Sequence, residues 1–510
     1  MKTKQFLAGA LLAMVAATSQ AGGILTNTNQ SVDFLRNPSR DAAIGLDGVY
    51  SNPAGVAFLP QGFHLGLNWQ YAHQTRTITS TNPLFALGRK NNGQTVKEFE
   101  GVADAPVIPS IQAAWNKGDW SMQFNFSVPG GGGKCEFADG LGSFESVVGN
   151  IAHQLQPLGA KGYDMDGYMQ GRQYYFGFQL GTAYKINKDL SVYGGLRLLY
   201  GTATYKARIS NIMVNTAGGY VDFGSFLSSA TATIDGGLSQ INAGMAQIAA
   251  GMAQYEAAGA TAAPEYVALQ QQNQALAAQK TQLEGSRQRV NQLWKYSEGV
   301  NLLCNQSSVG VAPVVGVDYR MGRLNFAAKY EFKTQMRMKN ESTVFEASEI
   351  DAVNKFRDGE EVNEDAPALL TVGVQWTPID PLRVNAGWHY FFDKDASWYG
   401  NTQDKLKHNS WELLLGGEYD VNNRVTVSLG GQLTRYGNSD EYMNDMSFVV
   451  NSYSIGFGMN YKLNDIVTLK AAYFQTNYGT YDRNNYPTAG VSDSFTRSNR
   501  VIGIGCDISL

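Results

Sequence analysis

The residues that could carry out catalysis are sparse, and their spacing matches no common active site. The five histidines show no metal-ligand spacing, and neither G-x-S-x-G nor H-E-x-x-H occurs. PGGGGKC at 129–135 resembles a phosphate-binding loop, but Val128 stands where the first glycine belongs and Cys135 replaces Ser or Thr. D-x-D-G at 164–167 opens like a calcium loop without the later glutamate. We therefore predict no enzyme activity, no cofactor and no bound metal.

Composition excludes a further class of function. The 510 residues include 40 Lys and Arg against 44 Asp and Glu, a formal net charge of −4 that offers nucleic acid no basic stripe. Glycine (56), tyrosine (27) and phenylalanine (24) are abundant, although the mean hydropathy is only −0.26. A chain of this length forms either several soluble domains or one large barrel, and the periodicity of the sequence distinguishes the two.

The first 21 residues have the features of a secretory signal peptide. Lys2 and Lys4 precede an apolar run at 6–17, and small residues end the run at Ser19 and Ala21. No later window offers the roughly 18 consecutive apolar residues that a membrane helix requires. Any membrane crossing must therefore be made by strands.

Apolar residues recur at every second position in long runs, the period of a strand with one polar and one apolar face. Trp411, Leu413 and Leu415, for example, alternate with Glu412 and Gly416. The connections alternate between short turns and long segments, an asymmetry typical of outer-membrane barrels and not of soluble sandwiches. We predict an all-β transmembrane barrel of about fourteen antiparallel strands, at 62–76, 106–116, 119–128, 170–187, 190–210, 308–320, 322–338, 366–377, 382–393, 409–421, 424–436, 449–462, 465–478 and 497–509.

The segment DGVYSNPAGVAFLPQG (47–62) precedes the first of these strands. Asn52 followed by Pro53 predicts a helix start, because Asn can cap free N–H groups and Pro fits the first helical position. Residues 22–61 carry too little apolar surface to fold alone. They therefore need a container.

Several of these segments carry a family resemblance. QSVDFLRNPSR (30–40), DGVYSNPAGVAFL (47–59) and the hairpins at 181–201 and 409–431 resemble the long-chain fatty acid transporter (FadL) family of outer-membrane proteins. The resemblance covers most of the chain after the leader except residues 211–307. It implies that residues 22–61 are a hatch inside a transmembrane barrel formed by residues 62–510, so the container is the lumen of the barrel.

The resemblance also implies a function and a set of site residues. The expected function is passive uptake of long-chain fatty acids or other hydrophobic compounds across the outer membrane. The compound is captured by the outer loops, enters an apolar pocket in the lumen, and leaves after hatch rearrangement by sideways release at an inward kink of strand 3. The expected partners are these small molecules and outer-membrane lipids, with no nucleic acid and a monomeric chain. The residues we assign are the hatch motif Asn52, Pro53 and Ala54, the substrate contacts Ile24, Leu25 and Phe34, and the lateral opening Val128, Pro129 and Gly130.

Inward-facing positions of the predicted strands are often glycine, which leaves space in the lumen for a hatch. The inward charges are of both signs, whereas a selective ion pore would favour one. Such charges suit ion pairs to the hatch or, equally, ion pairs across the wall. The glycines are those at 195, 373, 387, 416, 430, 456 and 458, and the charges are Arg197, Lys329, Lys333, Arg383, Glu331, Glu412 and Glu418.

Residues 225–300, in the long loop between strands 5 and 6, predict a helical hairpin. Their apolar residues repeat at heptad spacing on both sides of Pro264. One interpretation is that the two helices bury their seams on each other. The other is that Met245, Ile248 and Met252 form a hydrophobic capture surface. A hairpin of this kind also leaves an alternative function open, that of a surface adhesin or partner-binding scaffold.

Two of the three cysteines, Cys135 and Cys304, fall in the segments 129–169 and 211–307, which the strand assignment treats as loops on the same outer side. The compartment permits disulfides. A bridge between them and two free thiols remain open alternatives.

Overall fold

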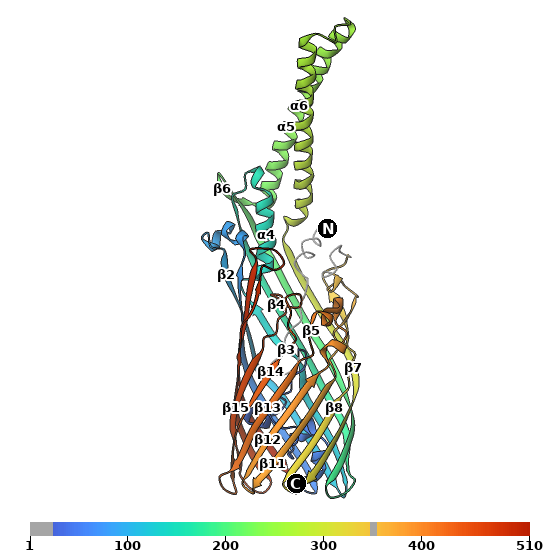
Figure 1. Ribbon diagram of the computed structural model, residues 1–510, viewed down its shortest axis with the longest axis vertical. Helices are drawn as coiled ribbons and strands as arrows, with labels where there is room; N and C mark the ends of the chain where they lie inside the picture. Colours follow the sequence, from blue (N-terminus) through green and yellow to red (C-terminus); the bar gives the residue numbers. More distant parts are fainter. Residues whose placement is uncertain (1–23, 347–353) are drawn as a thin grey trace.

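The computed structural model describes residues 24–346 and 354–510, and the predicted signal peptide lies outside the described residues. Fourteen strands pair with their neighbours in antiparallel order, and the first pairs with the last, from His64↔Ser509 to Thr81↔Ser492. The predicted closed barrel of fourteen strands is therefore confirmed (Figure 1). Its strands are β1 (Gly62–Thr81), β2 (Val96–Lys117), β3 (Trp120–Phe137), β4 (Gly162–Lys185), β5 (Leu190–Thr216), β7 (Val300–Met321), β8 (Leu324–Glu331), β11 (Leu369–Ile379), β12 (Leu382–Phe391), β13 (Trp411–Asp420), β14 (Val425–Arg435), β15 (Ser452–Lys462), β16 (Val467–Tyr478) and β18 (Ser492–Ser509).

The end of the barrel that carries the long loops is called the long-loop end, and the opposite end, which carries tight turns, is called the short-turn end. Shorter strands and helices lie at the long-loop end. The added strands are β6 (Gly219–Asp222), β9 (Arg337–Ser342), β10 (Glu361–Asn363) and β17 (Tyr481–Asn484). The added helices are α4 (Gly142–Gln154), η2 (Pro83–Leu87), η3 (Arg89–Asn91), η4 (Gln156–Leu158), η5 (Trp294–Tyr296), η6 (Asp393–Asp395) and η7 (Tyr399–Lys405).

One predicted strand is divided into two in the structure. The run 322–338 was expected to be continuous, but β8 stops at Glu331 and β9 starts at Arg337. The pairing of β8 with β11 ends at the same height, at Leu369↔Glu331, so the backbone beyond it loses this partner. The chain turns inward there, and Met336 and Met338 are fully buried.

The outer wall of the barrel is apolar. Leu180, Leu415 and Leu429, on three different strands, are each more than 60% exposed. The residues that alternate with such outward side chains along each strand point into a polar interior. A continuous belt of exposed apolar side chains this large is typical of a lipid-facing surface. Separately, none of the helices in the described part of the chain has the length and hydropathy required to cross a membrane.

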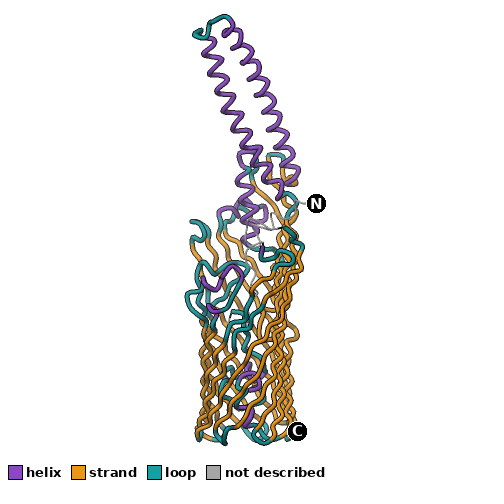
Figure 2. The backbone as a smooth tube through the Cα atoms, turned by 90° about the vertical axis from the view of Figure 1, so that its right-hand side faces the viewer, coloured by secondary structure: helices purple, strands orange, loops and turns teal. Residues whose placement is uncertain are grey.

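Residues 24–61, the described part of the hatch, lie inside the barrel (Figure 2). They form α2 (Val32–Arg36), α3 (Gly48–Ser51) and η1 (Gly55–Phe58). Ser31 caps α2, because its Oγ accepts a hydrogen bond from Phe34 N at 3.1 Å. Almost all of these side chains are buried, including many polar ones, so the segment depends on the wall to satisfy its polar groups.

Two long helices, α5 (Phe223–Ala257) and α6 (Pro264–Leu293), project from the long-loop end (Figure 1). A Cβ at Gly237, Gly244 or Gly251 would lie 3.1–3.3 Å from the Cδ1 atom of a leucine on α6. Glycine at every seventh position of α5 thus lets the two helices approach closely. The facing leucines are Leu283, Leu276 and Leu269.

Candidate functional site

The hatch lies on a row of glycines that crosses successive strands of the wall. A Cβ at Gly373 would lie 2.6 Å from Asp41 Cβ, and one at Gly430 would lie 2.7 Å from Pro38 Cδ. A Cβ at Gly456 would overlap the carbonyl oxygen of Leu35. The wall therefore approaches the hatch closer than any side chain would permit. Gly387 and Gly416 face Asp41 and Asn37 in the same way.

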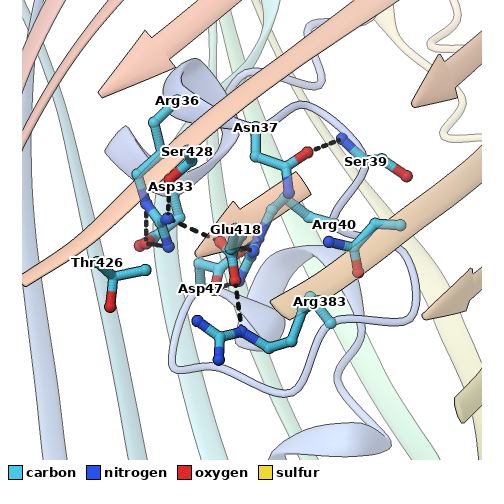
Figure 3. A network of polar contacts seen from close by, with 12 residues as sticks. Asp33, Arg36, Asn37, Ser39, Arg40, Asp47, Arg383, Glu418, Thr426 and Ser428 are labelled. Atoms are coloured by element: carbon cyan, nitrogen blue, oxygen red, sulfur yellow. Dashed lines mark hydrogen bonds and ion pairs between the residues drawn. The ribbon is translucent and has the colours of Figure 1, made fainter. Parts of the chain in front are cut away.

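A buried ion-pair network fixes the helix α2 end of the hatch to β13 and β12 (Figure 3). Glu418 Oε1 lies 2.7 Å from Arg36 Nη1 and 2.8 Å from Arg40 Nη1. Its other oxygen lies 3.2 Å from Arg383 Nε of the wall. Within the hatch, Arg40 also pairs with Asp47 at 2.8 Å. One wall carboxylate therefore joins two hatch arginines to a third on the wall.

A second wall cation binds the same helix from the other side. Lys470 of β16 pairs with Asp33 of the hatch and with Asp507 of β18. Asp33 in turn pairs with Arg36 at 2.7 Å. The two networks therefore share Arg36. Because their charges are buried, removing one side chain leaves the opposite charges of its partners without compensation.

A histidine forms a third connection. His389 of β12 contacts Asp41 of the hatch through Nε2 at 2.9 Å and Glu412 of the wall through Nδ1 at 2.8 Å. All three side chains are buried. An imidazole between two carboxylates fits its cationic form, which donates from both nitrogens.

The predicted inward charges divide between hatch and wall. Glu418 and Glu412 serve the hatch as described, whereas Arg197 and Lys329 both pair with Glu331 along the wall. Lys329 Nζ also donates to the Tyr50 carbonyl of the hatch at 2.8 Å. Both of the alternatives weighed from the sequence therefore occur. Lys333 lies nearer the long-loop end, one-third exposed and 3.8 Å from Asp365.

The hatch motif is held by three strands. Asn52 Nδ2 donates to Asp318 Oδ2 of β7 at 2.6 Å. The carbonyl of Pro53 accepts from Gln123 Nε2 of β3, and that of Ala54 from Ser191 Oγ of β5, both at 2.7 Å. Asn52 Oδ1 accepts from Gly55 N at 3.2 Å, so Asn52 closes the turn into η1 while its backbone ends α3.

The wall is interrupted between β2 and β3. The strands pair from Lys117↔Trp120 to Ile111↔Phe126 and again at Val102↔Glu136, but not between. Proline at 106, 109 and 129 removes donors here, and glycine at 130–133 permits a bend, with Gly131 and Gly133 at positive φ. Val107 of β2, beside the interruption, is 62% exposed.

The bend in β3 turns toward the N-terminal part of the hatch. Thr26 forms a bridge with Gly130, and Asn27 N donates to the Pro129 carbonyl at 2.9 Å. Val128 N donates to Gln30 Oε1 at 2.9 Å. Hatch residues thus provide partners that β2 does not provide.

A small cavity lies behind the bend. Its volume is about 20 Å³, room for a water and not for an organic molecule. The lining combines glycines and apolar side chains with one arginine. It includes Gly132, Gly133, Phe137, Leu141, Met169 and Arg76. Passage of an organic compound here requires the surrounding segments to move.

An acid outside the strands anchors the start of the hatch. Asp393 of η6 is fully buried and accepts hydrogen bonds from the backbone of Ser410, at 2.9 Å, and of Ile24. Burial raises the pKa of this carboxyl to about 6, and the two hydrogen bonds offset part of that shift. Ile24 is therefore held at the long-loop end of the lumen.

The structure brings some predicted site residues together and separates others. Ile24 and Leu25 share one buried cluster, and the Leu25 carbonyl lies against Gly130 of the bend. Phe34 belongs to another cluster and packs on Phe474, with 5.9 Å between the ring centroids. Met245, Ile248 and Met252 lie half-buried on α5, outside the barrel. The predicted substrate contacts therefore do not form one site.

The prediction that Cys135 and Cys304 lie in loops is wrong. Cys135 lies in β3 and Cys304 in β7, both are buried, and both thiols are free. They occupy one row of the wall, with Gly171 and Tyr205 between them. Three strand spacings of about 4.8 Å separate their Cα atoms by far more than a disulfide spans.

Sequence reasoning missed three wall residues that contribute to holding the hatch, Lys470, Asp507 and Asp318. Lys470, Asp507 and Asp318 each face inward in a predicted strand and have apolar residues next to them in the sequence. A charge at the inward phase of an alternating strand was the available signal. Which hatch residue each one would meet depends on strand register and not on local sequence.

Comparison with solved structures gives the architecture a precedent. No protein-family model and no curated protein matches the chain by sequence. A Pseudomonas aeruginosa FadL homologue superposes with a TM-score of 0.57 at 11% identity, covering 96% of this chain and 100% of its own. The chain has the FadL fold. The P. putida toluene transporter TodX superposes with a TM-score of 0.52 at 12% identity, covering 91% of this chain and 94% of its own.

The FadL fold therefore accommodates this chain almost end to end, although few residues are identical. Of these two proteins, TodX is a toluene transporter, whereas the other is described only as a FadL homologue. At this level of identity the likeness shows that the chain has the same architecture. It does not show which compound the chain binds.

Proposed function

We propose that the protein is an outer-membrane channel for the passive uptake of hydrophobic compounds, long-chain fatty acids among them. The observation that carries the proposal is the interruption between β2 and β3, which meets a bend that contacts the hatch. A transmembrane barrel with a sealed wall could release cargo only along its axis, where the docked hatch lies. An interrupted wall offers an apolar compound a route into the bilayer.

The proposed mechanism begins at the long-loop end. A compound enters among the buried apolar side chains around Ile24, Leu25 and Phe137, and the N-terminal part of the hatch withdraws from the bend. The small cavity then widens and joins the interruption beside Val107. Each CH₂ group that leaves water contributes roughly 0.8 kcal/mol, so partition alone drives the compound toward the bilayer.

The hatch motif provides the test of this function. Asn52→Ala removes the hydrogen bond to Asp318 and the one accepted from Gly55 N, so the hatch loses its register on β7 while the strands keep theirs. We expect a folded barrel with several-fold slower uptake. The measurement is entry of a fluorescent long-chain fatty acid and of toluene into cells that express the variant.

A matched control uses an asparagine that closes an exposed turn. Asn422 accepts from the backbone N–H groups of Arg424 and Val425 at the short-turn end, away from the hatch. Asn422→Ala should leave uptake unchanged. Heat-modifiable gel mobility checks folding of both variants, and normal uptake by a folded Asn52→Ala barrel would contradict the proposed role of the hatch.

The helical hairpin supports a second candidate function, display of a partner-binding arm. Its seam is occupied by its own leucines, which favours a self-contained arm over a capture surface. Replacing Met245, Ile248 and Met252 with Gln should therefore destabilise the hairpin, because a fully buried apolar side chain contributes roughly 1.5–3 kcal/mol and these half-buried ones contribute part of that each. Limited proteolysis should then cut between residues 225 and 300.

The outward face of α5 offers the control for this change. Ala246, Ala249 and Ala253 are exposed, so their replacement with Gln should leave the hairpin resistant to protease. Fatty-acid binding is measured on both variants. Retained resistance with weakened binding in the seam variant would restore the capture interpretation.

A further inference from the structure

Four basic side chains gather on the outer wall of β3, β4 and β5 toward the long-loop end. Lys134, Arg172, Lys206 and Arg208 are exposed and occupy even-numbered positions. The odd-numbered residues between them, such as Tyr205, are buried toward the lumen. These four residues, called the basic patch, therefore face outward on the lipid side of the wall.

The height of the basic patch follows from β4. Tyr184 and Tyr174 both face outward, and the strand between them rises about 25 Å along the barrel axis, the height of the apolar belt of an outer-membrane barrel. Aromatic side chains mark the two rims, with Trp120 against Tyr184 and Phe176 against Tyr174. Arg172 is the next outward residue. It lies about 5 Å beyond the rim, at the level of lipid headgroups.

The basic patch holds like charges at close quarters. Lys134 and Arg172 are direct partners across β3 and β4, and Lys206 lies diagonal to Arg172 on β5. Like charges so placed destabilise a sheet unless an anion lies between them. Among the described residues, Glu136 supplies the one carboxylate ion-paired with a member of the patch, at 2.6 Å from Lys134.

The remaining contacts of Arg172 are with uncharged groups, whereas Arg208 lies diagonal to the Asp166 carboxylate on β4. Arg172 Nη2 donates to Thr204 Oγ1 at 3.0 Å, and the Arg208 guanidinium lies 5.9 Å from the centre of the Tyr168 ring. The adjacent outer face of β2 carries Glu98, Glu100 and Asp104 instead. On the sector formed by β3, β4 and β5, the four cations of the patch therefore exceed the two carboxylates that lie beside them, Glu136 and Asp166.

We infer that the basic patch binds the phosphate groups of lipid headgroups in the leaflet at the long-loop end. Phosphate oxygens accept charge-assisted hydrogen bonds from lysine and arginine, and a lipid at the rim presents them at this height. Its acyl chains would lie against the apolar wall below, beside Phe176 and Tyr200. This inference rests on the membrane placement of the barrel and is independent of hatch transport.

The test compares lipid binding with and without the basic patch. The purified protein and its Arg172→Ala/Lys206→Ala/Arg208→Ala variant are titrated with diphosphoryl lipid A and examined by native mass spectrometry. Loss of three cations should weaken binding at least about tenfold. Fatty-acid uptake by the same folded variant should remain normal, which separates this inference from the proposed function.

The control removes the same number of charges from the other rim. Lys117, Lys188 and Arg424 are exposed at the short-turn end, and replacing all three with Ala should leave binding unchanged. Equal losses in both variants, equal binding of dephosphorylated lipid A, or displacement by millimolar inorganic phosphate would each overturn the inference. The last outcome would identify a small-anion site in place of a lipid site.

Discussion

Glu418→Ala will release the hatch from the wall while the barrel stays closed. The substitution leaves Arg36 and Arg40 buried without the carboxylate that joins them to β13. Arg36 keeps Asp33 and Arg40 keeps Asp47, but the network loses one buried negative charge and keeps all of its positive charges. An unbalanced buried charge of this kind costs up to about 3–5 kcal/mol. The barrel strands do not depend on this network for their own pairing, so the loss falls on the hatch.

Conductance in planar bilayers measures the release. The variant should show frequent openings and cells that express it should become sensitive to large hydrophilic antibiotics, whereas the parent protein stays closed. Glu341→Ala is a matched control, because Glu341 is an exposed carboxylate on β9. A Glu418→Ala barrel that conducts no more than the Glu341→Ala control would show that the network does not hold the hatch.

The strand pattern could be predicted from sequence because each strand faces lipid on one side and a polar interior on the other. Every predicted run overlaps a barrel strand. The alternation is strict because a shift of one residue would turn the polar face of a strand toward the lipid and its apolar face toward the lumen. Leu413, Leu415 and their alternating partners illustrate this. Beyond the apolar belt the constraint relaxes, and for that reason the predicted ends at the long-loop side differ from the structure in several strands, among them β2, β3, β4, β7 and β8.

The same relaxation explains the error over the cysteines. PGGGGKC has the composition of a loop, and only the pairing of β3 with β4, from Gly133↔Gln173 to Phe137↔Met169, returns Cys135 to the wall. Cys304 similarly belongs to the upper part of β7, whose outer residues are polar except for Leu303. Strands that continue above the membrane lose the alternation that identifies them.

The sequence predicted that inward charges of both signs line the lumen, but not which hatch residue each of them would pair with. Asn52 and Pro53 were expected to start a helix, whereas in the structure Asn52 ends α3 and η1 begins only at Gly55. The sequence located a turn here and not the residue at which the next helix begins. The partners of the hatch arginines come from strands hundreds of residues away, as Glu418 does. Such pairs are set by barrel closure and register, which no short segment encodes.

Gly456→Val is expected to displace the hatch by steric overlap alone. A Cβ at this position would occupy the space of the Leu35 carbonyl, a backbone atom that cannot rotate aside. Valine suits a strand, so β15 itself should tolerate the change. We expect residues 30–42 to lose hydrogen-exchange protection while the strands retain theirs, and channel openings to rise as for Glu418→Ala.

Gly194→Val separates this effect from a general intolerance of the wall. Gly194 also lies within a barrel strand, β5, but a Cβ there would meet no atom within 4 Å. The control should keep full hatch protection. If both variants behave like the parent, the hatch does not depend on close contact with the wall, and ion pairs alone hold it. If only Gly456→Val loses protection, the glycine row and the buried charges act together, since the glycines set the close approach at which Glu418 reaches Arg36 and Arg40.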